Sequence, residues 1–250
     1  MIFRKSFEKT LYKSKKRYYN IIIKGNESSG KERERTMKKE ETMEIKPIAM
    51  KKVKMRIVGD TPLIVHAWST KAKEMMLQAQ QGKKALKKDK GKNPYEDCIE
   101  SLYWLEGKPK EYTQEAFETA ISKGARFGFP VGGLKQAAIS AAYRMGWVKD
   151  KMGLRGAFFI KSADDDMFEI KGAGPSIRED MVRIGMGTAD IRYRGEFKNW
   201  YADIVVCYNA NGKFTIDDIA NIINAGGSVC GIGEWRPERD GQNGMFHVKQ

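Results

Sequence analysis

The chain has 250 residues, 41% of them hydrophobic and 31% charged, which is enough for one sizeable domain. Its 46 Lys and Arg outnumber its 32 Asp and Glu and leave a net charge of +14. A surplus of this size favours a polyanionic partner, and nucleic acid is the commonest one. The alternative is that the surplus lysines bind no partner and only keep the protein dispersed in solution.

The three cysteines, Cys98, Cys207 and Cys230, form no CxxC pair and no metal-ligand spacing with His66 or His247. We therefore expect neither a metal nor another cofactor, and sparse thiols are typical of a reducing cytoplasm. No apolar run approaches the roughly 20 residues that span a bilayer. No apolar core of signal-peptide length follows the charged start. A cytoplasmic protein that does not enter the membrane is expected.

Residues 1–42 differ in composition from the rest, because they hold 13 Lys and Arg and 6 Glu and so supply half of the net charge. Basic residues at 13–17 precede Tyr18 and Tyr19, a pattern suited to phosphates and bases, and also to a disordered leader. We predict a basic flexible tail over 1–42 and a nucleic-acid-binding domain over 43–250.

The first ordered pattern after the tail is a strand over 53–65, bent at Gly59–Pro62. Ser69 is a candidate N-cap for a helix through Gln80, with Met75 and Met76 at helical spacing. The lysine cluster at 83–92 indicates a solvated surface loop or a finger that grips a nucleic-acid strand. Residues 95–104 form a short helix or strand that returns to the core.

The second half alternates strands with two stronger helices. A strand ends at 127–130, and an alanine-rich helix over 134–145 follows Gly132-Gly133. Thr215 caps a helix over 216–225 that stops at Gly226-Gly227. Further strands are expected at 156–160, 167–170, 181–184, 204–208 and 245–248. This order predicts an α+β fold with a ferredoxin-like (RRM-like) βαββαβ core and insertions.

Paired glycines at the start of the first long helix suit an anion. Gly132 and Gly133 would let a backbone approach closely, where the helix N-terminus offers unpaired N–H groups. Lys135 in the first turn opposes the helix dipole unless a negative group lies nearby. A glycine pair needed for packing, beside an exposed lysine, explains the pattern equally well.

A glycine-rich segment near the C-terminus runs from Gly231 to Gly244 and contains Trp235, Arg236 and Arg239. A flexible loop with an aromatic ring and two guanidinium groups can stack a base and hold phosphates. It lacks both the GK[ST] ending of a P-loop and the strand-to-helix setting of a dinucleotide fold.

Taken in order, these segments resemble the RAMP superfamily, the repeat-associated proteins that form the backbone of CRISPR effector complexes. Pro62-Leu63 resembles the family's kink after the first strand, and Pro130 through Lys135 resembles its Pro-Gly-x-x-Leu-Lys helix start. Gly231 through Phe246 resembles its C-terminal glycine-rich loop. Val131 interrupts the helix motif, Gln136 replaces a glycine, and the helix arginine falls late, at Arg144. The departures indicate a divergent relative.

A basic stripe over 178–200 interleaves arginines with Tyr193 and Trp200, which suits a groove along a phosphate backbone, although both rings are equally typical of core residues. The candidate nucleic-acid contacts come from the helix start, this stripe and the glycine-rich loop. They are Gly132, Gly133, Lys135, Arg144, Arg183, Arg192, Arg194, Trp235, Arg236 and Arg239.

The sequence favours a binding protein over an enzyme. Asp164-Asp165-Asp166 is typical of a solvated turn, because three consecutive carboxylates cannot all face one ion in an extended chain. His66 has no evident base or metal partner. We predict a sequence-tolerant protein, encoded by a phage or mobile element, that coats single-stranded DNA or RNA as a homo-oligomer or filament. The alternative is a guide-RNA-binding CRISPR backbone subunit with RNA endonuclease activity that uses His66 and Asp60.

Overall fold

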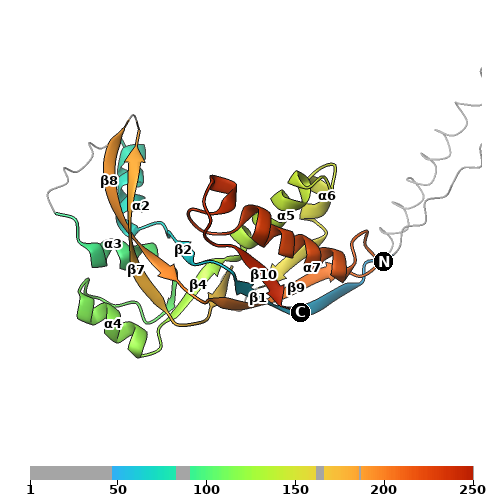
Figure 1. Cartoon of the computed structure of the whole chain (residues 1–250), viewed down its shortest axis with the longest axis horizontal. Coiled ribbons are helices and arrows are strands. Elements are labelled where there is room, and N and C mark those ends of the chain that lie inside the picture. Colours follow the sequence, from blue (N-terminus) through green and yellow to red (C-terminus); the bar gives the residue numbers. More distant parts are fainter. Residues whose placement is uncertain (1–46, 83–90, 162–165, 186, 250) are drawn as a thin grey trace, which may run out of the picture. The chain divides into compact units, whose positions relative to one another are not determined.

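The computed structural model describes residues 47–82, 91–161, 166–185 and 187–249. The predicted tail over 1–42, most of the lysine cluster and the residues Asp164 and Asp165 lie outside these ranges. The described part is a mixed α/β structure whose strands pair antiparallel (Figure 1).

Four strands form the largest sheet, in the order β10-β1-β9-β5. Their bounds are Met50–Gly59 for β1, Phe158–Lys161 for β5, Tyr201–Asn209 for β9 and Phe246–Lys249 for β10. β1 lies at the centre, because it pairs with β9 over its whole length and with β10 near its end. Helices α5 (Val131–Arg144) and α7 (Ile216–Ala225) pack against one another on the same side of this sheet (Figure 1).

Two smaller sheets complete the described part. β2, β8 and β7 form one, and β3, β4 and β6 form the other. The bounds are Leu63–Val65 for β2, Trp104–Glu106 for β3, Arg126–Pro130 for β4, Met167–Ile170 for β6, Pro175–Ile184 for β7 and Thr188–Phe197 for β8. The remaining helices are α2 (Thr70–Gln80), α3 (Pro94–Ser101), α4 (Gln114–Ser122) and α6 (Met152–Arg155).

Local sequence signals explain several elements directly. Ser69 caps α2 by accepting a hydrogen bond from the Ala72 N–H at 3.1 Å, as predicted. Thr215 and Asp218 form a reciprocal capping box at the start of α7, whose bounds match the predicted helix. The predicted strand over 167–170 is β6. Residues 95–104, for which a helix and a strand were both open, form α3 and lead into β3.

Three predicted boundaries are wrong. The strand predicted as bent at Gly59–Pro62 is two strands in different sheets, because β1 pairs with β9 and β10 whereas β2 pairs with β8. Gly132 and Gly133 lie inside the first turn of α5, not before it. The short strand predicted at 181–184 is the end of β7, which forms a long hairpin with β8 across most of the basic stripe.

The α-helix α7 ends just before Gly226-Gly227, as predicted, and a π-helical turn over Gly226–Cys230 continues directly from it. A Cβ on Gly227 would lie 1.8 Å from the Phe246 carbonyl oxygen, and one on Gly226 would lie 2.8 Å from Ala138 backbone atoms. The glycine pair therefore lets the turn pack directly against β10 and α5.

This packing yields a stability prediction. We expect Gly227→Ala to lower the free energy of unfolding by about 1–3 kcal/mol, because the added methyl group overlaps the backbone of β10. The control is Gly132→Ala, where nothing lies within 4 Å of the new Cβ. That change should be neutral or stabilising by up to about 1 kcal/mol, because alanine favours a helix. Denaturant unfolding measures both, and equal effects would contradict the prediction.

Candidate nucleic-acid interface

One cleft of about 210 Å³, here called the loop cleft, is lined by the chain just after β2, by α5 and by the glycine-rich segment. His66 lies on it just after β2, and Gly133 and Gln136 line it from α5. Gly231, Gly233, Glu234 and Arg236 of the glycine-rich segment complete the wall. Segments far apart in the chain thus share one surface.

The glycine-rich segment was predicted to be flexible, but backbone hydrogen bonds tie it to the chain around β2. The Glu234 N–H donates to the Ile64 carbonyl at 2.9 Å, and the Gly244 N–H donates to the Pro62 carbonyl at 2.8 Å. A Cβ on Gly233 would lie 2.3 Å from the Ile64 carbonyl oxygen. These glycines therefore serve close backbone approach.

The two rings singled out in the sequence have different environments. Trp235 is 40% exposed, at a backbone φ of +51°, and the Asn243 N–H donates to its carbonyl oxygen. Its indole is therefore available to a ligand. Trp200 is a core residue with only 1% of its surface exposed, and its indole N–H donates to the Thr61 carbonyl.

Carboxylates neutralise the cations around the loop cleft. Glu238 accepts from Arg144 and from Arg236, each at 3.0 Å, and Arg236 also donates to the Gly233 carbonyl. Glu234 lies 3.7 Å from His66 and 3.9 Å from Arg194. The pKa of Glu234 is lowered, chiefly by the nearby His66 ring and then by the charges of Arg194 and Arg236, against the opposing effect of burial.

The helix-start residues are engaged in packing. Gly133 accommodates the Phe129 ring, whose nearest atom would lie 2.9 Å from an added Cβ. The Lys135 ammonium group lies 4.5 Å from the Phe159 ring centroid and 5.7 Å from that of Phe158. Burial lowers the pKa of Lys135. Gly132 has open space around it and is exposed.

The hairpin's arginines form an ion-pair ladder on one face, because Arg178 lies opposite Arg194 and Asp180 lies opposite Arg192. Arg178 bonds Asp180 at 2.9 Å and Glu196 at 2.7 Å. Arg194 is only 3% exposed and bonds Asp180 at 3.2 Å, while its Nε atom has no hydrogen-bond partner among the described residues. The buried guanidinium of Arg194 is thus held by carboxylates.

The outermost arginines are more accessible. Arg192 lies 3.8 Å from Asp190. Arg183 is exposed, as is Arg239 in the glycine-rich segment, and neither forms an ion pair with another described residue. These positions keep their predicted role as candidate strand contacts.

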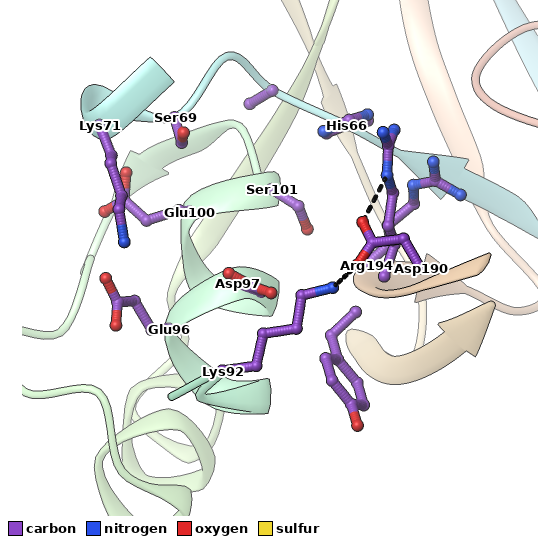
Figure 2. Close-up of a pocket in the computed structure, with 13 residues that line it drawn as sticks. His66, Ser69, Lys71, Lys92, Glu96, Asp97, Glu100, Ser101, Asp190 and Arg194 are labelled. Carbon is purple, nitrogen blue, oxygen red and sulfur yellow. Dashed lines mark hydrogen bonds and ion pairs between the residues drawn. The ribbon is translucent and has the colours of Figure 1, made fainter. Parts of the chain in front are cut away.

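A second, polar pocket of about 210 Å³ lies between α2, α3 and β8 (Figure 2). Glu96, Asp97 and Glu100 project from α3, and Lys92 contacts Asp190 and the Ile191 carbonyl. Lys92, Arg192 and Arg194 in this pocket each lie beside a carboxylate, which does not favour a polyanion.

The two residues proposed for RNA cleavage lie in separate ion pairs. Asp60 contacts His247 at 2.6 Å, whereas His66 faces Glu234. Within the described ranges, no group of three or more His, Cys, Asp or Glu side chains could hold a metal ion.

Exposed lysines that were not predicted as candidate contacts lie on the open face of the four-stranded sheet. Lys52 and Lys54 of β1, Lys161 of β5 and Lys249 of β10 are exposed there. The available signal was strict alternation over Lys52-Val53-Lys54-Met55-Arg56, which sends every second side chain to the same face.

The ladder predicts that Arg194 is structural. We expect Arg194→Ala to lower the free energy of unfolding by at least about 2 kcal/mol, because it leaves Asp180 and Glu234 with less compensation. Arg183→Ala, on the same hairpin, should cost less than about 0.5 kcal/mol. Chemical denaturation of both variants measures this. Equal stability would return Arg194 to the candidate strand contacts.

Within the described ranges, no helix is both long and apolar enough to cross a bilayer. No protein-family model matches the sequence, and no curated protein matches it either. The residues and their geometry therefore carry the functional argument.

Proposed function

We propose that the chain is a sequence-tolerant single-stranded nucleic-acid-binding protein, a divergent RAMP relative that coats its strand as a homo-oligomer. The observation that carries this proposal is the loop cleft, where the helix start and the glycine-rich segment meet the residues that follow the kink. The exposed Trp235 lies in the chain between Glu234 and Arg236, which both line this cleft. An exposed ring stacks on any base, and so it favours unpaired strands without selecting a sequence.

The sheet topology supports a ferredoxin-like core. Taken in chain order, the core strands are β1, β5, β9 and β10, and the sheet arranges them as last, first, third, second. α5 lies between the first and second core strands and α7 between the third and fourth, which is the βαββαβ order. The strands of the two smaller sheets occupy the intervening chain as insertions.

Backbone contacts between the segments support the RAMP relationship. Pro62 of the kink accepts from Gly244 of the glycine-rich segment, and Ile64 accepts from Glu234. Gly133 and Gln136 of the helix start face the same cleft. Motifs that lie near one another in space fit a common role better than scattered motifs would.

Exposed apolar side chains support self-association along the strand. Met181 and Ile191 lie opposite one another on the hairpin, with 68% and 43% of their surfaces exposed. A second exposed group, Tyr143, Trp147 and Met152, follows from the end of α5 into α6. Two unlike patches on one chain suit head-to-tail contacts, which extend into filaments.

The buried free thiols of Cys98, Cys207 and Cys230 fit a cytoplasmic location. Burial raises the pKa of Cys98 to about 12, so this thiol is suited to packing and not to chemistry. A phage or mobile element is the proposed genetic source.

The first prediction from this function is salt-dependent binding. The chain should bind labelled oligothymidylate and oligouridylate in gel-shift titrations, with log affinity falling against log salt at a slope steeper than about −2. Strands of equal length and different sequence should bind with similar affinity, since base-specific hydrogen bonds are not invoked. Absence of binding at low salt would sink the proposal.

A second prediction separates stacking from simple exposure. Trp235→Ala should weaken single-strand binding by about 1–3 kcal/mol and leave the melting temperature unchanged, because the residue is exposed and its chain neighbours Glu234 and Arg236 line the loop cleft. The matched control is Trp68→Ala, which removes an indole that is 62% exposed and lies outside both the loop-cleft lining and the apolar groups proposed for self-association. Equal losses of affinity in the two variants would remove the loop cleft from the interface.

A further inference from the structure

The open face of the four-stranded sheet lies opposite α5 and α7 and is strongly basic (Figure 1). Alternation along β1 buries Ile57 toward the helices and directs Lys52, Lys54 and Arg56 to the open side. The strand register extends this set, because residues directly opposite in paired strands share a face.

Cross-strand rows define the surface. Lys52 and Phe159 flank Cys207 in one row, and Lys54 and Lys161 flank Val205 in the next. In a third row, Arg56 lies between Lys249 and Asp203. We call this set of cations, with Lys171 beside it, the sheet-face cluster. It draws on β1, β5 and β10.

Little negative charge opposes the sheet-face cluster. Asp203 bonds Arg56 at 2.7 Å and Lys171 at 3.2 Å, and these cations lower its pKa, the Arg56 hydrogen bond first. Among the described residues, Lys52, Lys54, Lys161 and Lys249 form no ion pair. This contrasts with five arginines of the hairpin and the loop cleft that each have a carboxylate beside them, namely Arg178, Arg192, Arg194, Arg144 and Arg236.

Aromatic rings accompany the cations. Phe159 is 49% exposed at the β5 edge of the face. The Arg56 guanidinium lies 4.7 Å from the centroid of the Tyr201 ring. Cations beside partly exposed rings combine the two contacts that single-strand binders use, namely phosphate attraction and base stacking.

We propose that the sheet-face cluster binds the phosphate backbone of a single-stranded nucleic acid, as a second surface distinct from the loop cleft. This inference rests on the proposed function. Lysines two residues apart on a strand are about 6.8 Å apart, comparable to the phosphate spacing of an extended single strand. The rings favour a nucleic acid over an acidic polypeptide, which offers carboxylates but no bases to stack.

The test neutralises lysines that have no ion-pair partner within the described part of the chain. Lys52→Gln, Lys54→Gln and Lys249→Gln are combined in the full chain, and binding to labelled oligothymidylate is titrated against salt. The matched control combines Lys73→Gln, Lys110→Gln and Lys123→Gln, which removes the same charge from exposed positions on other surfaces. Melting curves establish that both triple variants fold.

Each phosphate contact to a single strand contributes about 0.7 to the slope of log affinity against log salt, so the loss of three contacts should reduce this slope by about 2 in the sheet-face variant. The salt slope of the control variant should change by less than about 0.5, because its substitutions alter only the long-range electrostatic field of the protein. Equal changes in the two variants would overturn the inference. The inference would also be overturned if polyglutamate competed for binding as strongly as an oligonucleotide of equal charge.

A second measurement needs no variant. Bound strand should protect Lys52, Lys54 and Lys249 of the wild-type chain from acetylation, read by mass spectrometry, while Lys73, Lys110 and Lys123 stay reactive. The wild-type chain could bind the strand, and lose affinity on Trp235→Ala, while its sheet-face lysines stay unprotected. That result would overturn this inference and leave the proposed function standing. Failure of the wild-type chain to bind would overturn the proposed function as well.

Discussion

The pairing of β1 with both β9 and β10 constrains the rest of the described structure. Its hydrogen bonds run over ten residues of β1 and hold each side chain to one of two faces. Ile57 joins the core beneath the helices, and Lys52, Lys54 and Arg56 stay outside. A register slip of one residue would exchange these sets, placing charged groups against the helices at prohibitive cost. The same pairing that builds the core therefore also concentrates charge on the open face.

The turn after β1 carries this constraint to the loop cleft. The Asp60 N–H donates to the Met245 carbonyl, and the Gly244 N–H donates to Pro62 just before β2. The glycine-rich segment is thereby held between the two sheets to which β1 and β2 belong. Glycine is required where backbones meet this closely, as at Gly233 against Ile64. The composition of the glycine-rich segment alone predicted a flexible loop, whereas these contacts explain why the segment is ordered.

Local signals predicted much of the fold. The α7 boundaries followed from Thr215 with Asp218, and the α2 start followed from Ser69, because capping acts within a few residues. The hairpin ladder could not be predicted in this way, because the Arg178–Glu196 and Arg194–Asp180 bonds join positions that only the β7–β8 register brings together. Arg194 was therefore interpreted as a strand contact although its neighbours bury it. The sheet-face cluster was not predicted for the same reason, since its three strands, β1, β5 and β10, are far apart in sequence.

The distribution of neutralised and unopposed cations suggests a division of roles between the two surfaces. At the loop cleft, Glu238 holds Arg144 and Arg236 in fixed positions, which favours shape and stacking around Trp235 over net attraction. On the open sheet face, Lys52, Lys54, Lys161 and Lys249 form no ion pair with another described residue, and under the proposed function their long flexible side chains would contribute attraction at little geometric cost. Neither surface needs to present a fixed donor and acceptor pattern to base edges. Binding built from stacking and phosphate contact depends on chain length and salt and is insensitive to sequence, which is the behaviour that a strand-coating protein requires.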